Sequence, residues 1–82
     1  MLTVMDIDRL NQAIGEELRI VRLRKKLSRA TMAELSGVGA RTIQRIENGE
    51  RPADINQMAA LCAVLDQPIV SLMSRAVERA EQ

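Results

Sequence analysis

The sequence predicts a small all-α domain built from five helices. Apolar residues recur at three- and four-residue steps, which is the spacing of one helix face. Glycine, proline, serine or aspartate stands at or near each break in that pattern, as expected where helices end and begin. A chain of 82 residues has room for one core and for no second domain.

The predicted core is aliphatic, because the chain contains no Phe, Trp or Tyr. Each large aliphatic side chain that is fully buried contributes roughly 1.5–3 kcal/mol, enough for a compact helical domain. The lone Cys62 cannot form an internal disulfide, which fits a reducing cytosol, and its apolar neighbours place it in the core. No run approaches the ~20 apolar residues of a membrane-spanning helix, and no secretory signal is present. We therefore expect a cytoplasmic protein with no membrane contact.

The first helix is marked by apolar residues at helical spacing, and its best-supported part covers Asn11 to Lys26. Whether it begins already near Asp6 is left open. The segment from Met1 to Met5 fits a frayed tail, a helix extension or a strand that contacts a partner. We accordingly divide the chain into an N-terminal tail or helix extension over residues 1–10 and a domain over residues 11–82.

Two short helices joined by a glycine turn are predicted next, over about residues 28–48. Ser28 is a good N-cap for the first, and Gly37 supplies the positive φ of a sharp turn. The second covers residues 40–47 and ends at Asn48-Gly49. We expect the apolar side chains around the turn to fill the small core between the two helices: Leu35, Val38, Ile43 and Ile46. A helix, a short turn and a second helix are the parts of a helix-turn-helix DNA reader.

Two further helices follow a loop that contains Pro52. Asp54 is the expected N-cap of a helix that continues to about Leu65, and Pro68 fits the first turn of the last helix. The residues expected to face inward on the fourth helix are Ile55, Met58, Ala59, Leu61, Cys62 and Leu65. The last helix carries a stripe that extends past what a small core needs, at Met73, Ala76, Val77 and Ala80. This stripe is either a homodimer surface or a face that packs on the domain itself.

The segment from Leu27 to Gly49 resembles the phage-repressor, or Xre-like, helix-turn-helix family of the Cro and lambda-repressor type. That family shows the pattern LSQ, then LA.LAGVS, then TI.RIENG. The matching elements are Leu27-Ser28, Met32-Ala33-Glu34-Leu35, Gly37-Val38, Arg41-Thr42-Ile43 and Arg45-Ile46-Glu47-Asn48-Gly49. The resemblance extends more loosely from Ile14 to Leu72. It implies a compact five-helix lambda-repressor-like domain, and a dimeric repressor that binds double-stranded DNA at a two-fold symmetric operator.

The charge distribution agrees with a DNA-facing surface. From Arg19 to Arg51 there are nine basic and three acidic residues, a net charge of +6, whereas the whole chain carries +1. For Arg24-Lys25-Lys26 alone, a solvated helix face explains the charges equally well. Because the basic block coincides with the helix-turn-helix segment, a surface that faces phosphates explains it better.

The resemblance also implies roles for individual residues. Those expected to face the bases are Gly39, Ala40, Arg41, Gln44 and Arg45, of which Arg45 could instead bind a phosphate or an acidic neighbour. Those expected to contact phosphates are Arg29, Thr42, Asn48, Arg51, Lys25 and Lys26. Arg22 and Glu47 resemble an ion pair of the family that links the first and third helices.

Three positions depart from the family pattern. Gly39 stands where Ser or Thr normally caps the recognition helix, and Ala40 stands where a longer polar base reader is common. Direct readout therefore rests on fewer side chains, so specificity depends more on DNA shape. Arg29 replaces the usual glutamine; it keeps a phosphate role but puts the glutamine's contact with a neighbouring base reader in doubt.

The sequence lacks the residue types that the common catalytic sites require. The chain has no histidine and one cysteine, which excludes a Ser-His-Asp triad and the usual zinc sites. Gly37-Val38-Gly39 follows a helix and lacks the third glycine of a dinucleotide loop. We expect no catalysis, no metal and no cofactor. The alternative function is a protein-interaction module, an antitoxin or an adaptor with a regulatory protein partner, which the weak readout at Gly39 and Ala40 favours and the basic block opposes.

Overall fold

The computed structural model describes residues 6–82 and contains five helices in that range. They are α1 (Ile7–Arg24), α2 (Arg29–Ser36), α3 (Ala40–Glu47), α4 (Ile55–Val64) and α5 (Ile69–Glu81), and no strand occurs among the described residues. The predicted all-α class is therefore confirmed. The expectations for Met1 to Met5 lie outside the described residues.

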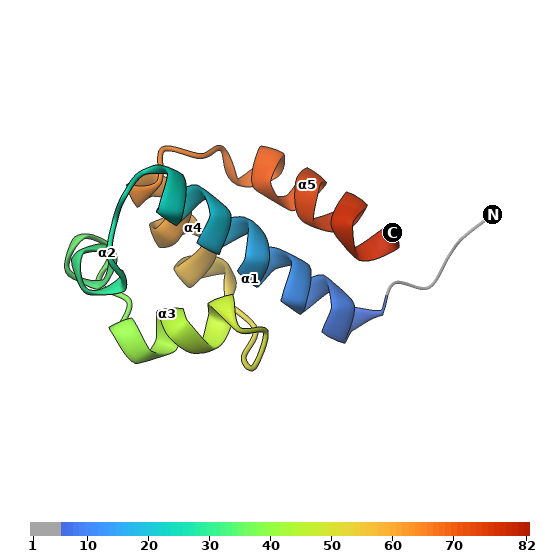
Figure 1. The fold of residues 1–82 in the computed structure, drawn as a ribbon, viewed down its shortest axis with the longest axis horizontal. Coiled ribbons are helices and arrows are strands. Elements are labelled where there is room, and N and C mark those ends of the chain that lie inside the picture. Colours follow the sequence, from blue (N-terminus) through green and yellow to red (C-terminus); the bar gives the residue numbers. More distant parts are fainter. Residues whose placement is uncertain (1–5) are drawn as a thin grey trace.

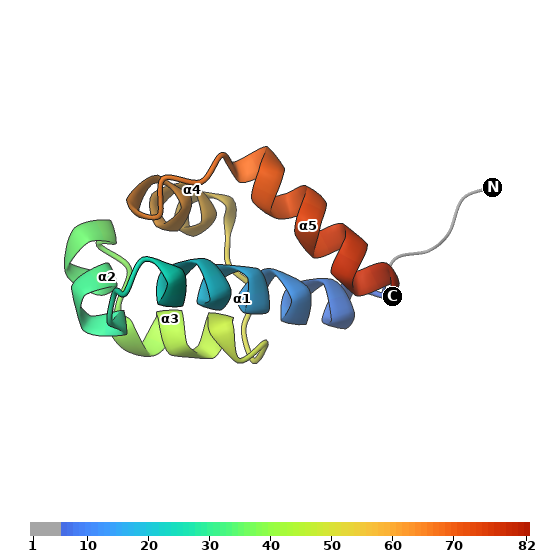
Figure 2. The ribbon, with the colours of Figure 1, turned by 45° about the horizontal axis from the view of Figure 1, so that its top comes forward.

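The arrangement places α1 at the centre of the domain. In Figures 1 and 2, α5 lies along one side of α1 and α3 along another, while α2 lies beyond the C-terminal end of α1. The second helix contacts both α3 and α4, and α4 contacts α5. This leaves α2 and α3 together at the surface, on the side of the molecule away from α5 (Figure 2).

The helix ends follow from local chemistry. Asp6 accepts a hydrogen bond from the Arg9 backbone N–H at 3.2 Å, so α1 begins at Ile7, four residues before the best-supported part of the prediction. At the other end, Lys26 adopts the left-handed conformation with φ 58°. The N–H groups of Lys26 and Leu27 donate to the carbonyls of Leu23 and Arg22, which closes the last turn as a Schellman motif. Asp54 and Gln57 form a capping box at the start of α4.

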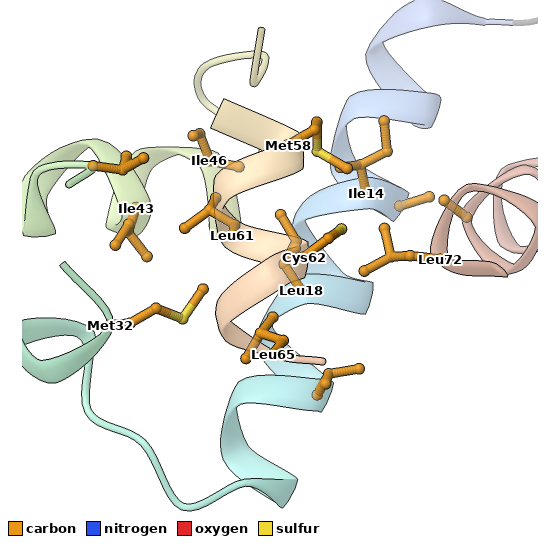
Figure 3. Packing of buried hydrophobic residues seen from close by; sticks show 14 of the residues in the cluster. Ile14, Leu18, Met32, Ile43, Ile46, Met58, Leu61, Cys62, Leu65 and Leu72 are labelled. Atoms are coloured by element: carbon orange, nitrogen blue, oxygen red, sulfur yellow. The ribbon is translucent and has the colours of Figure 1, made fainter. Parts of the chain in front are cut away.

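The core is aliphatic, as expected (Figure 3). Seven large side chains are less than 2% exposed, namely Leu18, Met32, Ile43, Ile46, Leu61, Leu65 and Leu72. Cys62 is 2% exposed among them, and burial raises the pKa of its thiol. A buried thiol of raised pKa is a poor nucleophile, so Cys62 acts as a small apolar core residue.

Three residues expected in the core are exposed instead. Leu35 is 64% exposed because Met32, Ala33 and Ser36 occupy the inward side of α2. Ile55 is 71% exposed because it is the first residue of α4, beyond the part of that helix covered by its neighbours. Ala59 is also exposed, since it follows the inward-facing Met58 by one residue and points away from the core.

The stripe on α5 is divided between two environments. Ala76 and Ala80 are 0% and 6% exposed within the chain's own fold, where α5 packs along α1, so these two residues follow the alternative of packing on the domain and not that of a dimer surface. Their small side chains let the two helices approach. Met73 and Val77 are half-buried and line an open apolar groove with Ile55, Ile69 and Val70.

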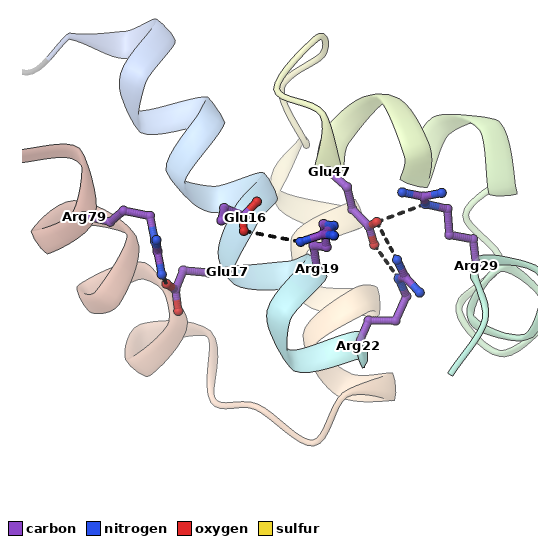
Figure 4. Close-up of polar contacts among 7 residues, drawn as sticks. All are labelled: Glu16, Glu17, Arg19, Arg22, Arg29, Glu47 and Arg79. Atoms are coloured by element: carbon purple, nitrogen blue, oxygen red, sulfur yellow. Dashed lines mark hydrogen bonds and ion pairs between the residues drawn. The ribbon is translucent and has the colours of Figure 1, made fainter. Parts of the chain in front are cut away.

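A buried acid also joins α5 to α1. Glu17 is 5% exposed, and its carboxylate accepts a hydrogen bond from Arg75 Nε at 2.9 Å. It also accepts one from Arg79 Nη2 at 2.7 Å, and Figure 4 shows Glu17 with Arg79. Burial alone would raise the pKa of Glu17, but the hydrogen bonds and charges of Arg79 and Arg75 together outweigh it, so the pKa is lowered. No local sequence pattern indicates this bridge, because the two arginines lie 58 and 62 residues after Glu17.

No single described helix is long and apolar enough to cross a membrane. Only α4 and α5 taken together reach that length and composition, and they are bent by 108° at their junction.

Candidate nucleic-acid interface

The unit formed by α2, the turn and α3 is held by its caps and by one apolar residue. The Ser28 hydroxyl accepts the Thr31 N–H at 3.0 Å and so begins α2. Gly37 ends α2 with φ 77°, a conformation that a side chain would strain. Val38 is 8% exposed and anchors the turn in the core. Gly39 occupies the N-cap of α3 without a side-chain hydrogen bond, which leaves the start of α3 open to solvent.

The recognition helix α3 has one face in the core and one in solvent. Ile43 and Ile46 are each 1% exposed and fix its inward face. The exposed residues on the outward side are Arg41, Gln44, Arg45 and Asn48, which share one face by their spacing of three and four. Gly39 and Ala40 are exposed at its N-terminal end, and Thr42 is half-buried beside them. The residues expected to read bases therefore lie together on one exposed surface.

Several basic side chains near this surface form no ion pair with an acidic side chain among the described residues. None of the ion pairs between described residues involves Arg41, Arg51, Lys25 or Lys26. All four are exposed. Arg45 lies 3.8 Å from Glu50, with both side chains about half exposed, which is a weak pairing. Glu50 is thus the acidic neighbour that was one of the expected partners of Arg45, and the Arg45 side chain remains accessible to solvent.

Arg22 and Glu47 join α1 to α3 in a buried ion pair (Figure 4). Arg22 Nε donates to Glu47 Oε2 at 2.7 Å, and Arg22 Nη2 donates to Oε1 at 2.9 Å. The remaining terminal nitrogen, Nη1, donates to the Leu27 carbonyl at 2.9 Å, just before α2. The hydrogen bonds to Glu47 raise the pKa of the Arg22 guanidinium. This pair fixes where the C-terminal end of α3 lies relative to the start of α2.

Arg29, the first residue of α2, contacts the same carboxylate. Its Nε donates to Glu47 Oε1 at 3.0 Å, while its side chain stays 36% exposed. Arg29 was expected to contact phosphate, and its bond to Glu47 was not expected from the sequence. The only hint was the replacement of the family's neutral glutamine by a cation at this position.

No metal centre accompanies these residues. Within the range 6–82, no group of three or more Cys, Asp or Glu side chains is placed to hold an ion.

The comparison with family models decides the classification. Residues 13–72 match the model described as "Helix-turn-helix domain". The chain belongs to the helix-turn-helix domain family. The match covers α2, the turn, α3 and α4 completely, together with most of α1 and the first turn of α5.

Two relatives of this helix-turn-helix chain come from Bacillus subtilis (strain 168). The HTH-type transcriptional regulator RghRB is 41% identical over 66 residues, covering 76% of this chain and 45% of the relative. The HTH-type transcriptional repressor RghR is 39% identical over 69 residues, covering 79% of this chain and 49% of the relative. The chain thus spans about half the length of these two relatives.

Solved structures of helix-turn-helix regulators share the fold. The restriction-modification controller protein C.AhdI from Aeromonas hydrophila superposes with a TM-score of 0.73 at 31% identity, over 76% of this chain and 94% of its own. The clp gene regulator ClgR from Corynebacterium glutamicum gives a TM-score of 0.83 at 24% identity, over 88% of this chain and 77% of its own. At that identity the second likeness shows the fold alone. The lambda-repressor-like, helix-turn-helix character predicted from the sequence is confirmed.

Proposed function

We propose that this protein is a sequence-specific double-stranded DNA-binding transcription regulator that inserts α3 into the major groove. The single observation that carries the proposal is the division of α3 into two faces. Ile43 and Ile46 anchor one face in the core, and the other presents an exposed row of polar and basic side chains. A helix held in this way offers its outward face to a groove as a rigid unit.

Base reading falls mainly on two side chains. Arg41 can donate two hydrogen bonds to the O6 and N7 of guanine, and Gln44 can pair with the N6 and N7 of adenine. Each such pair is worth roughly 1–3 kcal/mol of discrimination. Ala40 offers a methyl group to a thymine methyl, Gly39 lets the DNA approach the helix end, and Arg45 extends the same surface.

Phosphate contacts would hold the helix in register. The proposed donors are Arg29 and Thr42 near the helix starts, Asn48 and Arg51 after α3, and Lys25 and Lys26 after α1. These contacts supply affinity and salt dependence without selecting a sequence.

Dimerisation and repression complete the proposal. A single helix of eight residues reads only a few base pairs, so we propose a homodimer on a two-fold symmetric operator with half-sites ~34–36 Å apart. The apolar groove lined by Met73 and Val77, together with the exposed Val70, is the surface we assign to the dimer. RghR is named a repressor, which supports the same role for this chain in the cytoplasm. The proposal includes no catalytic role.

A protein-interaction module is the second candidate. Two observations favour it: Gly39 and Ala40 supply no polar side chain to the bases, and the groove beside Val70 is apolar. An antitoxin or adaptor would use that groove to bind a protein partner.

Selection from a random duplex pool, followed by sequencing, tests the proposal. The folded protein should enrich a two-fold symmetric motif. Arg41→Gln should broaden the motif at one position in each half-site, whereas Arg9→Gln should leave it unchanged. Arg9 is a matched control because it is exposed and lies in the first turn of α1, at the end far from α2 (Figure 1). Failure of the wild-type protein to enrich any motif would contradict sequence-specific binding.

Salt dependence separates the two candidates. Binding to duplex DNA should weaken linearly on a log–log plot as salt rises, with a slope near −0.9 per phosphate contacted. Binding dominated by an apolar protein contact should be nearly independent of salt.

A further inference from the structure

Glu47 holds two arginines, and they use its carboxylate differently. Arg22 donates from two nitrogens and is buried, with 7% of its side chain exposed. Arg29 donates from Nε alone, at 3.0 Å, and its side chain is 36% exposed. The carboxylate itself is 1% exposed. It therefore binds Arg29 from inside the fold, and Figure 4 shows the Arg29 guanidinium facing Glu47 through Nε.

The free donors of Arg29 are all on its outer nitrogens. A guanidinium has five N–H donors in a fixed planar fork, and the bond to Glu47 uses the one on Nε. That bond fixes the position of Nε, and the terminal nitrogens lie in the same plane as Nε, on the side away from the side-chain stem. Arg29 is thus the one arginine of this cluster whose terminal N–H groups are not bonded to described residues.

The charge of the cluster is not balanced within the protein. Two guanidinium cations face one carboxylate, which leaves a net charge of +1. That charge stands at the first residue of α2, where the helix dipole is also positive and a cation is locally unfavourable. A cation that is unfavourable for its own helix and is held rigidly at the surface is best explained by an external anion.

We infer that Glu47 is a positioning residue that orients Arg29 to bind a DNA phosphate. The inference rests on the proposed function, because it places the phosphate on the DNA bound by α2 and α3. Glu47 touches no DNA in this arrangement. It fixes the guanidinium before DNA arrives, so the side chain loses little conformational freedom when the phosphate binds. The ion pair that joins α1 to α3 therefore also organises a DNA contact of α2.

Two variants at position 29 test the inference while Glu47 and Arg22 remain in place. Affinity for the selected operator is measured over a range of salt concentrations for wild type, Arg29→Gln, Arg29→Lys and the control Arg9→Gln, with thermal unfolding followed in parallel. Arg29→Gln should lower the log–log salt slope by about 0.9 per protomer and weaken binding about tenfold, equally for all sequences. Arg9→Gln should change neither quantity appreciably.

Arg29→Lys separates positioning from charge. The lysine keeps the cation, so the salt slope should stay close to that of wild type. An ammonium carries its three donors on one nitrogen, so it lacks the planar fork whose separate nitrogens bind Glu47 and the phosphate in a fixed relative orientation. Affinity should therefore fall several-fold below wild type while remaining above that of Arg29→Gln.

Each contrary result overturns a stated part of the inference. An unchanged slope and affinity in Arg29→Gln, with only its melting temperature altered, would show that Arg29 is purely structural. Wild-type affinity in Arg29→Lys would show that orientation by Glu47 is irrelevant. Absence of DNA binding by the wild-type protein would instead contradict the proposed function itself.

Discussion

Gly15 of α1 lies directly against the carbonyl oxygen of Ile46 in α3, with no space for a side chain between the two helices. A Cβ added at Gly15 would collide with that oxygen and lie 2.9 Å from the carbonyl oxygen of Glu47. Both obstacles are backbone atoms, which cannot rotate away. The close approach brings the C-terminal end of α3 onto α1, beside the ion pair between Arg22 and Glu47.

Gly15→Ala should destabilise the domain by about 1–3 kcal/mol, measured by urea unfolding followed by circular dichroism. The sign of this change in unfolding free energy tests the steric argument, because replacing glycine with alanine inside a helix ordinarily stabilises a protein by up to about 1 kcal/mol. Gly39→Ser is the matched control. Its Cβ would meet only Thr42 Oγ1 at 3.8 Å, and the new hydroxyl should stabilise the start of α3 by a few tenths of a kcal/mol. A stabilised Gly15→Ala variant would refute the steric argument.

Arg22→Ala should cost about 3–5 kcal/mol of the free energy of unfolding, because it leaves a buried carboxylate with Arg29 as its remaining partner. The comparison is Arg19→Ala, which removes an exposed pairing with Glu16 at 3.4 Å and should cost less than about 1 kcal/mol. Unfolding of both variants in urea measures the difference. An Arg22→Ala protein that stays as stable as wild type but loses DNA binding would contradict the structural role.

The acid stability of the domain should depend on Glu17. Its pKa is lowered in the folded state, so its contribution is complete above the unfolded value of 4.5 and is lost as the pH falls through the folded pKa. The melting temperature of the wild-type protein should therefore decrease as the pH is lowered below about 4.5. Glu17→Gln should be less stable at pH 7 and show a shallower acid decline. Glu16→Gln, at an exposed acid, should retain the wild-type profile; an unaltered decline in Glu17→Gln would reject the assignment.

Arg41→Ala and Lys25→Ala should weaken DNA binding in different ways. The first removes a base reader and should relax preference at one base position, at a cost of about 1–3 kcal/mol for the preferred sequence. The second removes a phosphate contact and should weaken all sequences about equally. Affinities for a set of single-base operator variants provide the test. A uniform loss in both proteins would mean that α3 is not placed in the groove as proposed.

The proposed dimer surface can be tested by introducing one charged side chain into the apolar groove of α5. Val70 is 73% exposed, so Val70→Asp should leave the domain folded but bring a desolvated carboxylate into the proposed interface. Sedimentation should then show a shift from dimer to monomer. Ser71→Asp adds the same charge one residue away, at an exposed position that does not line the groove, and should remain dimeric. A wild-type monomer at all concentrations would rule out the dimer.

The short-range features of the fold were accessible from the sequence. Ser28, Asp54 and Pro68 were predicted to start helices and do so, and Gly37 and Gly49 adopt the positive φ expected where helices end. These features depend on hydrogen bonds and backbone sterics within a few residues, so the local sequence suffices to predict them.

Burial at the edges of helix faces was harder to predict. Periodicity identifies an apolar side, but Leu35 and Ile55 show that the neighbouring helices decide how much of that side is covered. Ala76 and Ala80 show the converse, because small residues on α5 mark a close approach to α1 rather than a spare surface.

Contacts between distant segments were the least predictable part of the candidate site. The pairing of Arg22 with Glu47 was expected only through the family resemblance. The bond between Arg29 and Glu47 depends on how α2 and α3 are oriented, which no local pattern encodes. Gly15 offered one signal that could have been used: an isolated glycine inside an amphipathic helix often marks a close backbone contact.

The salt bridges of Glu17 carry a consequence for how the chain folds as it is synthesised. Its partners Arg75 and Arg79 lie 58 and 62 residues later in the sequence. A nascent chain that has completed α1 to α4 therefore still carries the Glu17 carboxylate without its partners, and the side of α1 that receives Ala76 and Ala80 is still uncovered. The main contacts of α2 and α3 are with α1, with α4 and with each other, and all of these helices are present at this stage, whereas α1 is covered on its remaining side only when α5 has left the ribosome. α5, which is made after α1 to α4, thus secures α1.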